Sequence, residues 1–153
     1  MLDLNDLANK LVPYLTPSFL SLRTGYKEST WTPTYSGATT TGVTTYAANG
    51  QVGVYTRVGR AVFFSLYVSW TAATGTGTAV ITLPLNVANV TNQLFAPSLW
   101  YAGITYGTGT GVIAVIRPNT ARAELWSPAN NAGSAGIAVE AAGEIIMTGH
   151  YVI

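Results

Sequence analysis

The sequence predicts an all-β protein, an antiparallel β-sandwich of jelly-roll-like type with a short N-terminal α-helix. From Trp31 onward, short apolar runs alternate with turn-rich segments, which is typical of sandwiches and barrels. One long hairpin stands out near residues 50–71. The 153 residues are enough for one hydrophobic core. We therefore expect a helix and connector over residues 1–29 and a single sandwich domain over residues 30–153.

The N-terminal segment carries an apolar stripe at helical spacing. Its members are Leu4, Leu7 and Leu11. Asp3 is placed to cap the helix, and Pro13 ends the pattern. Because so short a helix is marginal alone in water, we expect it to dock on its own domain, on a sister chain or on another protein. Residues 13–29 look like an extended connector.

The hairpin is expected to supply the central strands of the fold. After the turn, one face is wholly apolar: Val62, Phe64, Leu66, Val68 and Trp70. Gly59 and Arg60 fit a two-residue turn with glycine first. The other face interleaves Phe63 and Tyr67 with small hydroxyl residues, and we expect Tyr55 of the preceding strand to join them. Such a face needs a cover or a ligand.

The remaining strands follow as short apolar runs. We expect them at "VTTYAA" from residue 43, "AVITLPL" from 79, "LWYAGITY" from 99, "VIAVIR" from 112, "RAELW" from 122 and "EIIMTGHYVI" from 144. The similar segments "TGTGTAVI" and "GTGTGVIAVI" are read as flexible hairpin tips. Since no helix follows either one, they are not phosphate-binding loops.

Composition excludes several function classes. Charged residues make up 8% of the chain, against about 25% in an average soluble protein. The seven basic residues are scattered and the net charge is +1, so we expect no nucleic-acid partner. No apolar run approaches the ~20 residues of a membrane-spanning helix, so we expect no membrane insertion. The N-terminus, with Asp3 and Asp6, does not resemble a signal peptide.

Few residues of the sequence could carry catalysis or bind a metal. The chain has one histidine, His150, and no cysteine. The carboxylates outside the helix, Glu28, Glu124, Glu140 and Glu144, show no spacing typical of a glycosidase pair or a metal site. We therefore expect a protein that is not an enzyme, with no catalytic residues, no metal site and no cofactor.

Several short motifs resemble a β-module that recurs in the virion proteins of tailed bacteriophages. They are "TWTPTYSG" from residue 30, the hairpin "GQVGVYTRVGR" from 50, the strand ending "LPL" at 83–85, and the closing "TGHYVI". The module positions are Trp31, Pro33, Gly53, Tyr55, Arg57, Gly59, Leu83, Pro84, Gly149 and Tyr151. The resemblance covers residues 30–153.

The resemblance implies a non-enzymatic virion component, commonly a homotrimer. It leads us to expect a capsid decoration, cement or head-fibre protein at the virion surface, made in the host cytoplasm. Leu4, Leu7 and Leu11 would attach it to another virion protein such as the capsid shell. The alternative is a tail-fibre receptor-binding module that binds host surface glycans.

The two hypotheses predict different functional residues. Tyr55, Phe63 and Tyr67 would lie between subunits of the trimer; alternatively, the chain's own connector covers them. If the protein binds a host glycan, the candidate stacking residues are Trp100, Tyr101 and Tyr106, beside the tip at residues 107–111.

Overall fold

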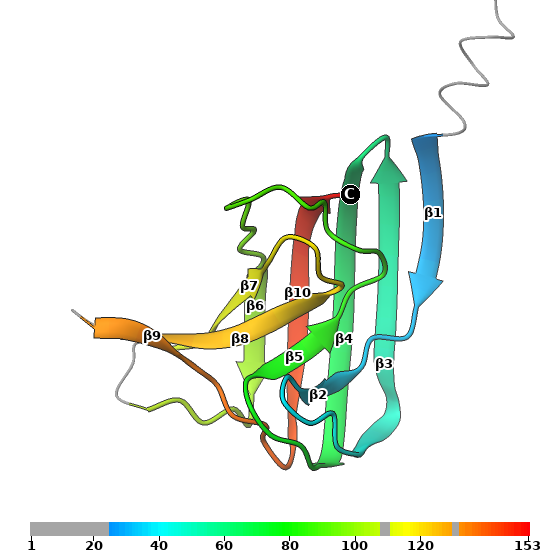
Figure 1. Cartoon of the computed structure of the whole chain (residues 1–153). Coiled ribbons are helices and arrows are strands. Elements are labelled where there is room, and N and C mark those ends of the chain that lie inside the picture. Colours follow the sequence, from blue (N-terminus) through cyan, green and yellow to red (C-terminus); the bar gives the residue numbers. More distant parts are fainter. Residues whose placement is uncertain (1–24, 108–110, 130–131) are drawn as a thin grey trace, which may run out of the picture.

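A computed structural model describes residues 25–107, 111–129 and 132–153, which form two antiparallel β-sheets packed on one another (Figure 1). The all-β prediction is confirmed. The predicted N-terminal helix lies outside the described residues. The strands are β1 (Tyr26–Trp31), β2 (Tyr35–Gly37), β3 (Thr44–Val58), β4 (Ala61–Ala73), β5 (Ala79–Thr82), β6 (Ser98–Ala102), β7 (Ile113–Ile116), β8 (Arg122–Ala129), β9 (Ala132–Gly136) and β10 (Gly143–Val152).

The chain passes repeatedly between the sheets. The first sheet has the order β1-β3-β4-β10-β6, and the second has the order β2-β5-β8-β7 with β9 paired to β8. Each of the six predicted apolar runs overlaps a strand of these sheets. The structure adds β2 and β9, and it starts β1 at Tyr26, within the segment that we expected to be connector.

The hairpin β3–β4 forms as predicted. Val58 pairs with Ala61, which leaves Gly59 and Arg60 as the turn. The φ angle of Gly59 is +60°, whereas Arg60 is not among the residues with positive φ, as in a type II′ turn. Its two-residue length fixes the register of every later pair, including Tyr55 with Phe64 and Thr56 with Phe63.

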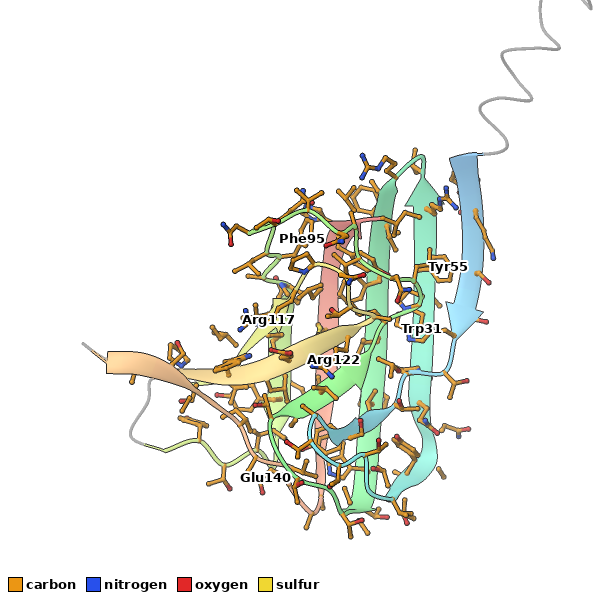
Figure 2. All side chains as sticks on the ribbon, in the orientation of Figure 1. Trp31, Tyr55, Phe95, Arg117, Arg122 and Glu140 are labelled. Carbon is orange, nitrogen blue, oxygen red and sulfur yellow. The ribbon has the colours of Figure 1, made fainter. Side chains whose placement is uncertain are left out.

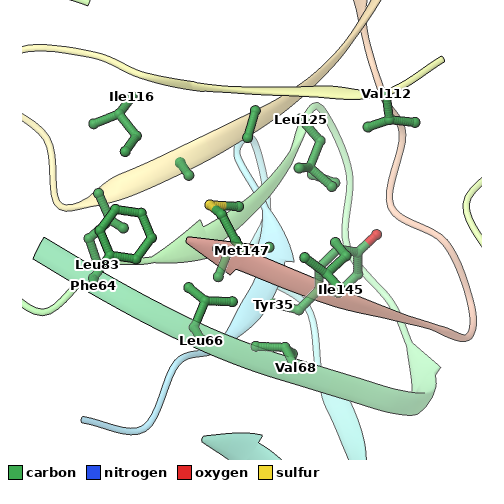
Figure 3. Close-up of a cluster of buried hydrophobic side chains, with 14 of the residues drawn as sticks. Tyr35, Phe64, Leu66, Val68, Leu83, Val112, Ile116, Leu125, Ile145 and Met147 are labelled. Carbon is green, nitrogen blue, oxygen red and sulfur yellow. The ribbon is translucent and has the colours of Figure 1, made fainter. Parts of the chain in front are cut away.

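The core lies between the two sheets (Figure 3). Phe64, Leu66 and Val68 of β4 face inward, as the alternation predicts. Residues Ile145 and Met147 of β10 are fully buried beside them, and Leu125 of β8 closes the core from the second sheet. Each fully buried side chain of this size stabilises the fold by about 1.5–3 kcal/mol relative to an exposed one.

The prediction for Tyr55 is wrong. Its side chain is 7% exposed and lies inside the sandwich, where the ring of Trp31 contacts it edge to face at 6.1 Å (Figure 2). The reason is the register: directly paired residues share a face, and Tyr55 pairs with the core residue Phe64. The valines of β3, which alternate with Tyr55, therefore lie outside.

The described ends of the chain meet at the β3–β4 turn. The backbone N–H of Gly59 donates to the carbonyl of Gly25 at 2.7 Å. On the other side of the turn, the N–H of Ile153 donates to the carbonyl of Arg60, and the Arg60 Nε donates to the carbonyl of Ile153. Residues 25 and 153 thus lie at the same end of the molecule.

Candidate functional site

The most extensive apolar surface among the described residues is the outward side of the first sheet, here called the outer face. The strand register places alternate residues of β1, β3, β4, β10 and β6 on it. Its large apolar side chains are each 43–52% exposed: Tyr26, Val52, Val54, Val58, Phe63, Trp100 and Ile146. Monomers rarely leave so large a continuous apolar surface in water.

The outer face is not flat. A shallow depression of about 590 Å³ lies over β3, between the side chains of β1 and those of β4. Its lining includes Glu28, Val54, Thr56 and Phe63. The larger side chains Phe63 and Tyr67 stand along β4 beside the valine row of β3. The surface thus has a groove next to an aromatic ridge.

The outer face is nearly free of charge. Apart from its tyrosines, the ionisable side chains that the register places on it are Glu28, Glu144 and His150. Glu28 accepts a hydrogen bond from Tyr26, and Glu144 accepts one from Tyr67 at 2.9 Å. Both carboxylates therefore have partners on the face itself, and the area between them offers apolar groups and hydroxyls.

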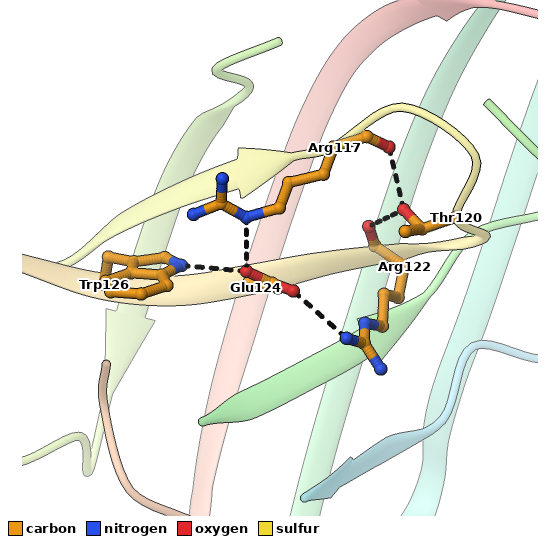
Figure 4. Close-up of polar contacts among 5 residues, drawn as sticks. All are labelled: Arg117, Thr120, Arg122, Glu124 and Trp126. Carbon is orange, nitrogen blue, oxygen red and sulfur yellow. Dashed lines mark hydrogen bonds and ion pairs between the residues drawn. The ribbon is translucent and has the colours of Figure 1, made fainter. Parts of the chain in front are cut away.

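The second sheet carries a different surface, an ion cluster on β7 and β8 (Figure 4). Glu124 accepts hydrogen bonds from Arg117 Nε at 2.8 Å, from Arg122 Nη2 at 3.2 Å and from Trp126 Nε1 at 3.2 Å. The Arg117 guanidinium also lies 5.3 Å from the centre of the Trp126 ring. Burial by itself raises the pKa of the Glu124 carboxyl, but the bonds from Arg117, Trp126 and Arg122 outweigh it and lower that pKa.

The predicted glycan residues do not form one platform. Tyr101 and Tyr106 contact each other, with ring centroids 6.0 Å apart at 88°. Trp100 belongs to the outer face, since it pairs with Ile146, whereas Tyr101 pairs with the core residue Ile145. The structure therefore brings two of the three together and places Trp100 on the opposite side of the sheet.

The predicted attachment residues Leu4, Leu7 and Leu11 lie outside the described residues. Of the predicted interface residues, Phe63 and Tyr67 share the outer face and Tyr55 does not. Sequence reasoning missed the valines of β3. Counting back from the Gly59 turn would have found them, because that count pairs Thr56 with Phe63.

The one histidine of the sequence, His150, lies beside two aromatic rings. Its ring centroid is 5.9 Å from that of Phe63 and 6.2 Å from that of Phe95. Over residues 25–107, 111–129 and 132–153 no three His, Asp or Glu side chains are grouped as metal ligands would be. The same part of the chain contains no helix able to cross a membrane.

Among known proteins, a solved structure with a similar fold was found. No family model matches the chain, and no curated protein matches it in sequence. The crystal structure of the Dettilon tailspike protein matches it with a TM-score of 0.62 and 16% identity, over 82% of this chain and 23% of that chain. The fold of this chain is therefore similar to that of one segment of the tailspike. Because the match spans so little of the tailspike, it says nothing about that protein's other parts.

Proposed function

We propose that this protein is a non-enzymatic structural component of a bacteriophage virion, a trimeric capsid decoration, cement or head-fibre protein. The observation that carries the proposal is the tailspike-like fold, which agrees with the phage-module motifs of the sequence. The surface supports an assembly role: it is poor in charge and holds an extended apolar face.

In this proposal the residues that precede β1 attach the protein to the particle, rather than the whole of residues 1–29, because Tyr26–Trp31 forms β1 of the sandwich. Leu4, Leu7 and Leu11 contribute the apolar stripe, and burying three leucines is worth about 5–8 kcal/mol before ordering costs. The sandwich then points outward. Gly25, where the described fold begins, lies at one end of the sandwich beside the β3–β4 turn, which leaves the other end free.

A second candidate function is host recognition by a tail protein that binds surface glycans. The match to a tailspike favours a place on the tail, and the contact between Tyr101 and Tyr106 supplies an aromatic pair. Aromatic rings bind the apolar faces of sugars, and Thr105, which precedes Tyr106 in the sequence, offers a hydroxyl.

Particle binding tests the proposal. Purified full-length protein is added to particles that lack it, and bound protein is quantified after sedimentation. We expect binding by the full chain, loss of binding with Leu7→Asp because the substitution places a charge in the apolar contact, and unchanged binding with Lys10→Gln. Equal binding by the Leu7→Asp variant would contradict attachment through the stripe.

The copy number per particle separates the two candidates. Quantitative mass spectrometry of purified virions gives this number directly. A capsid decoration is present in many copies over the shell, whereas a receptor-binding protein is present as a few trimers at the tail. A glycan array with Tyr106→Ala as the comparison variant then tests sugar binding.

A further inference from the structure

We propose that copies of this chain pack against one another through the outer face, with the aromatic ridge of one copy in the groove of the next. This inference deepens the proposed function by stating where the subunits meet. The interface residues are Val52, Val54, Val58, Phe63, Tyr67, Trp100 and Ile146. Tyr55, buried inside each subunit, takes no part.

The size of the apolar surface supports the inference. The seven half-exposed side chains of the outer face, which include Tyr26 and exclude the more buried Tyr67, leave about 600 Å² of apolar area in water. That equals the largest patches on ordinary monomers and approaches the ~800 Å² that each partner contributes to a stable protein interface. The hydroxyl groups of Thr56 and Ser65 lie among these side chains and add to the contact area.

The chemistry of the face favours a second copy over a charged partner. Its two carboxylates, Glu28 and Glu144, lie on strands β1 and β10, which β3 and β4 separate, so they form no cluster of negative charge for a basic protein. A neutral surface of apolar groups and hydroxyls matches another surface of the same kind. A second copy of this chain has such a surface.

The relief of the face is self-complementary. The groove lies over Val54 and Thr56 of β3, and Phe63 on the adjacent strand β4 lines its side, with Tyr67 further along the same strand. A threefold axis parallel to the strands and in front of the outer face turns β4 of each copy toward β3 of the next. The ridge of one copy then meets the groove of its neighbour, a heterologous contact that closes on itself after three copies.

Two positions of matched exposure provide the test. Val54 is 48% exposed on the outer face, and Ile113 is 41% exposed on the second sheet, where it pairs with Trp126. The full-length protein and its Val54→Glu and Ile113→Glu variants are compared by light scattering coupled to size exclusion. We expect the wild type and Ile113→Glu to be oligomers, and Val54→Glu to need at least tenfold higher concentration to associate.

Single cysteines add a second measurement, because the natural chain has none. In the Val54→Cys variant we expect maleimide labelling to slow as protein concentration rises, in step with the mass. In the Ile113→Cys variant the labelling rate should not depend on concentration. Circular dichroism establishes that each variant is folded, and Phe63→Glu replaces Val54→Glu if the latter is not.

Three results would overturn the inference. One is a wild-type monomer at all concentrations up to the millimolar range. Another is an oligomer whose mass survives both Val54→Glu and Phe63→Glu. A third is slow labelling of the Val54→Cys variant in the monomer, which would show that residues 1–24 of the same chain cover the face. None of these measurements uses virus particles, so they fail or succeed independently of the particle-binding test.

Discussion

The ring of Tyr35 stacks on the ring of Trp70, with centroids 3.8 Å apart and planes 17° apart. Tyr35 belongs to β2 of the second sheet and Trp70 to β4 of the first, so the stack joins the two layers. Both side chains also bond to the backbone of Glu140. The Trp70 Nε1 donates to the Glu140 carbonyl, and the Glu140 N–H donates to the Tyr35 hydroxyl. This contact fastens the segment before β10 to both sheets.

Removing the hydroxyl and removing the ring should have different costs. Tyr35→Phe keeps the stack but leaves the part-buried N–H of Glu140 without its acceptor, so we expect a loss of about 1–2 kcal/mol in the free energy of unfolding. Tyr35→Leu also loses the aromatic contact, and we expect a loss of about 3 kcal/mol or more. Urea denaturation measures both. Equal losses would show that the stack contributes nothing.

Alkaline pH should destabilise the fold through two tyrosines. Burial raises the pKa of Tyr35 to about 12, and it raises that of Tyr151 to about 12. Because these pKa values lie above the ordinary value of about 10, the stabilisation is complete below pH 10 and is lost as pH rises toward 12. Each tyrosine contributes a slope of about 1.4 kcal/mol per pH unit. Denaturation from pH 9 to 12 should show a shallower slope for Tyr35→Phe.

Acid should weaken the ion cluster on the second sheet. The folded state lowers the pKa of Glu124, so its contribution is complete above the unfolded value of about 4.3 and is lost as pH falls through the folded value. Glu124→Gln should cost about 1–3 kcal/mol at pH 7 and flatten the decline below pH 4.3. Melting curves from pH 7 to 2 measure this. The exposed Glu28 supplies the control variant Glu28→Gln, which should leave the decline intact.

The turn glycine is needed for its backbone conformation. Gly59 has a φ of +60°, and a side chain added there would meet no atom within 4 Å. Gly59→Val should therefore lose about 1–2 kcal/mol from backbone strain alone. Gly59→Asn should lose less, since asparagine tolerates this region. Thermal melting distinguishes them, and a neutral Gly59→Val would contradict the assigned turn.

Another glycine is needed for space. A Cβ on Gly53 would lie 2.6 Å from the Trp31 ring, whereas one on Gly107 would meet nothing within 4 Å. Gly53→Ala should push the indole aside and cost about 1–3 kcal/mol, with a change in tryptophan fluorescence. Gly107→Ala should change neither property.

The phage-module motifs predicted the fold because their residues build it. Trp31 lies over Gly53, and its Nε1 donates to the carbonyl of Thr82 on the second sheet. Tyr151 is fully buried, and its hydroxyl both donates to the carbonyl and accepts from the N–H of Leu85, just after the Leu-Pro pair. These residues are structural, so they carry information about architecture and little about the ligand or partner.

The surface was harder to predict for a physical reason. Both faces of β3 carry apolar residues, so the alternation along the strand does not indicate which face is buried. The valines lie on one face, and Tyr55 and Gly53 lie on the other. The core prefers the latter because Gly53 makes room for Trp31. The ion cluster depends on β7 and β8 pairing Val115 with Glu124, which brings Arg117 into reach. The spacing of three charged residues alone does not indicate it.

The meeting of Gly25 and Ile153 at one end has a mechanical consequence. Suppose that the domain is held through the residues before Gly25 while a drag force acts on the far end of the sandwich. The force then acts along β1. Its six registered pairs with β3, from Tyr26 with Val58 to Trp31 with Gly53, are then loaded together in shear. Force applied between Gly25 and Ile153 acts across the strands instead and opens those pairs one at a time. The same domain is therefore strong when held from one end and weak when its two ends are pulled apart.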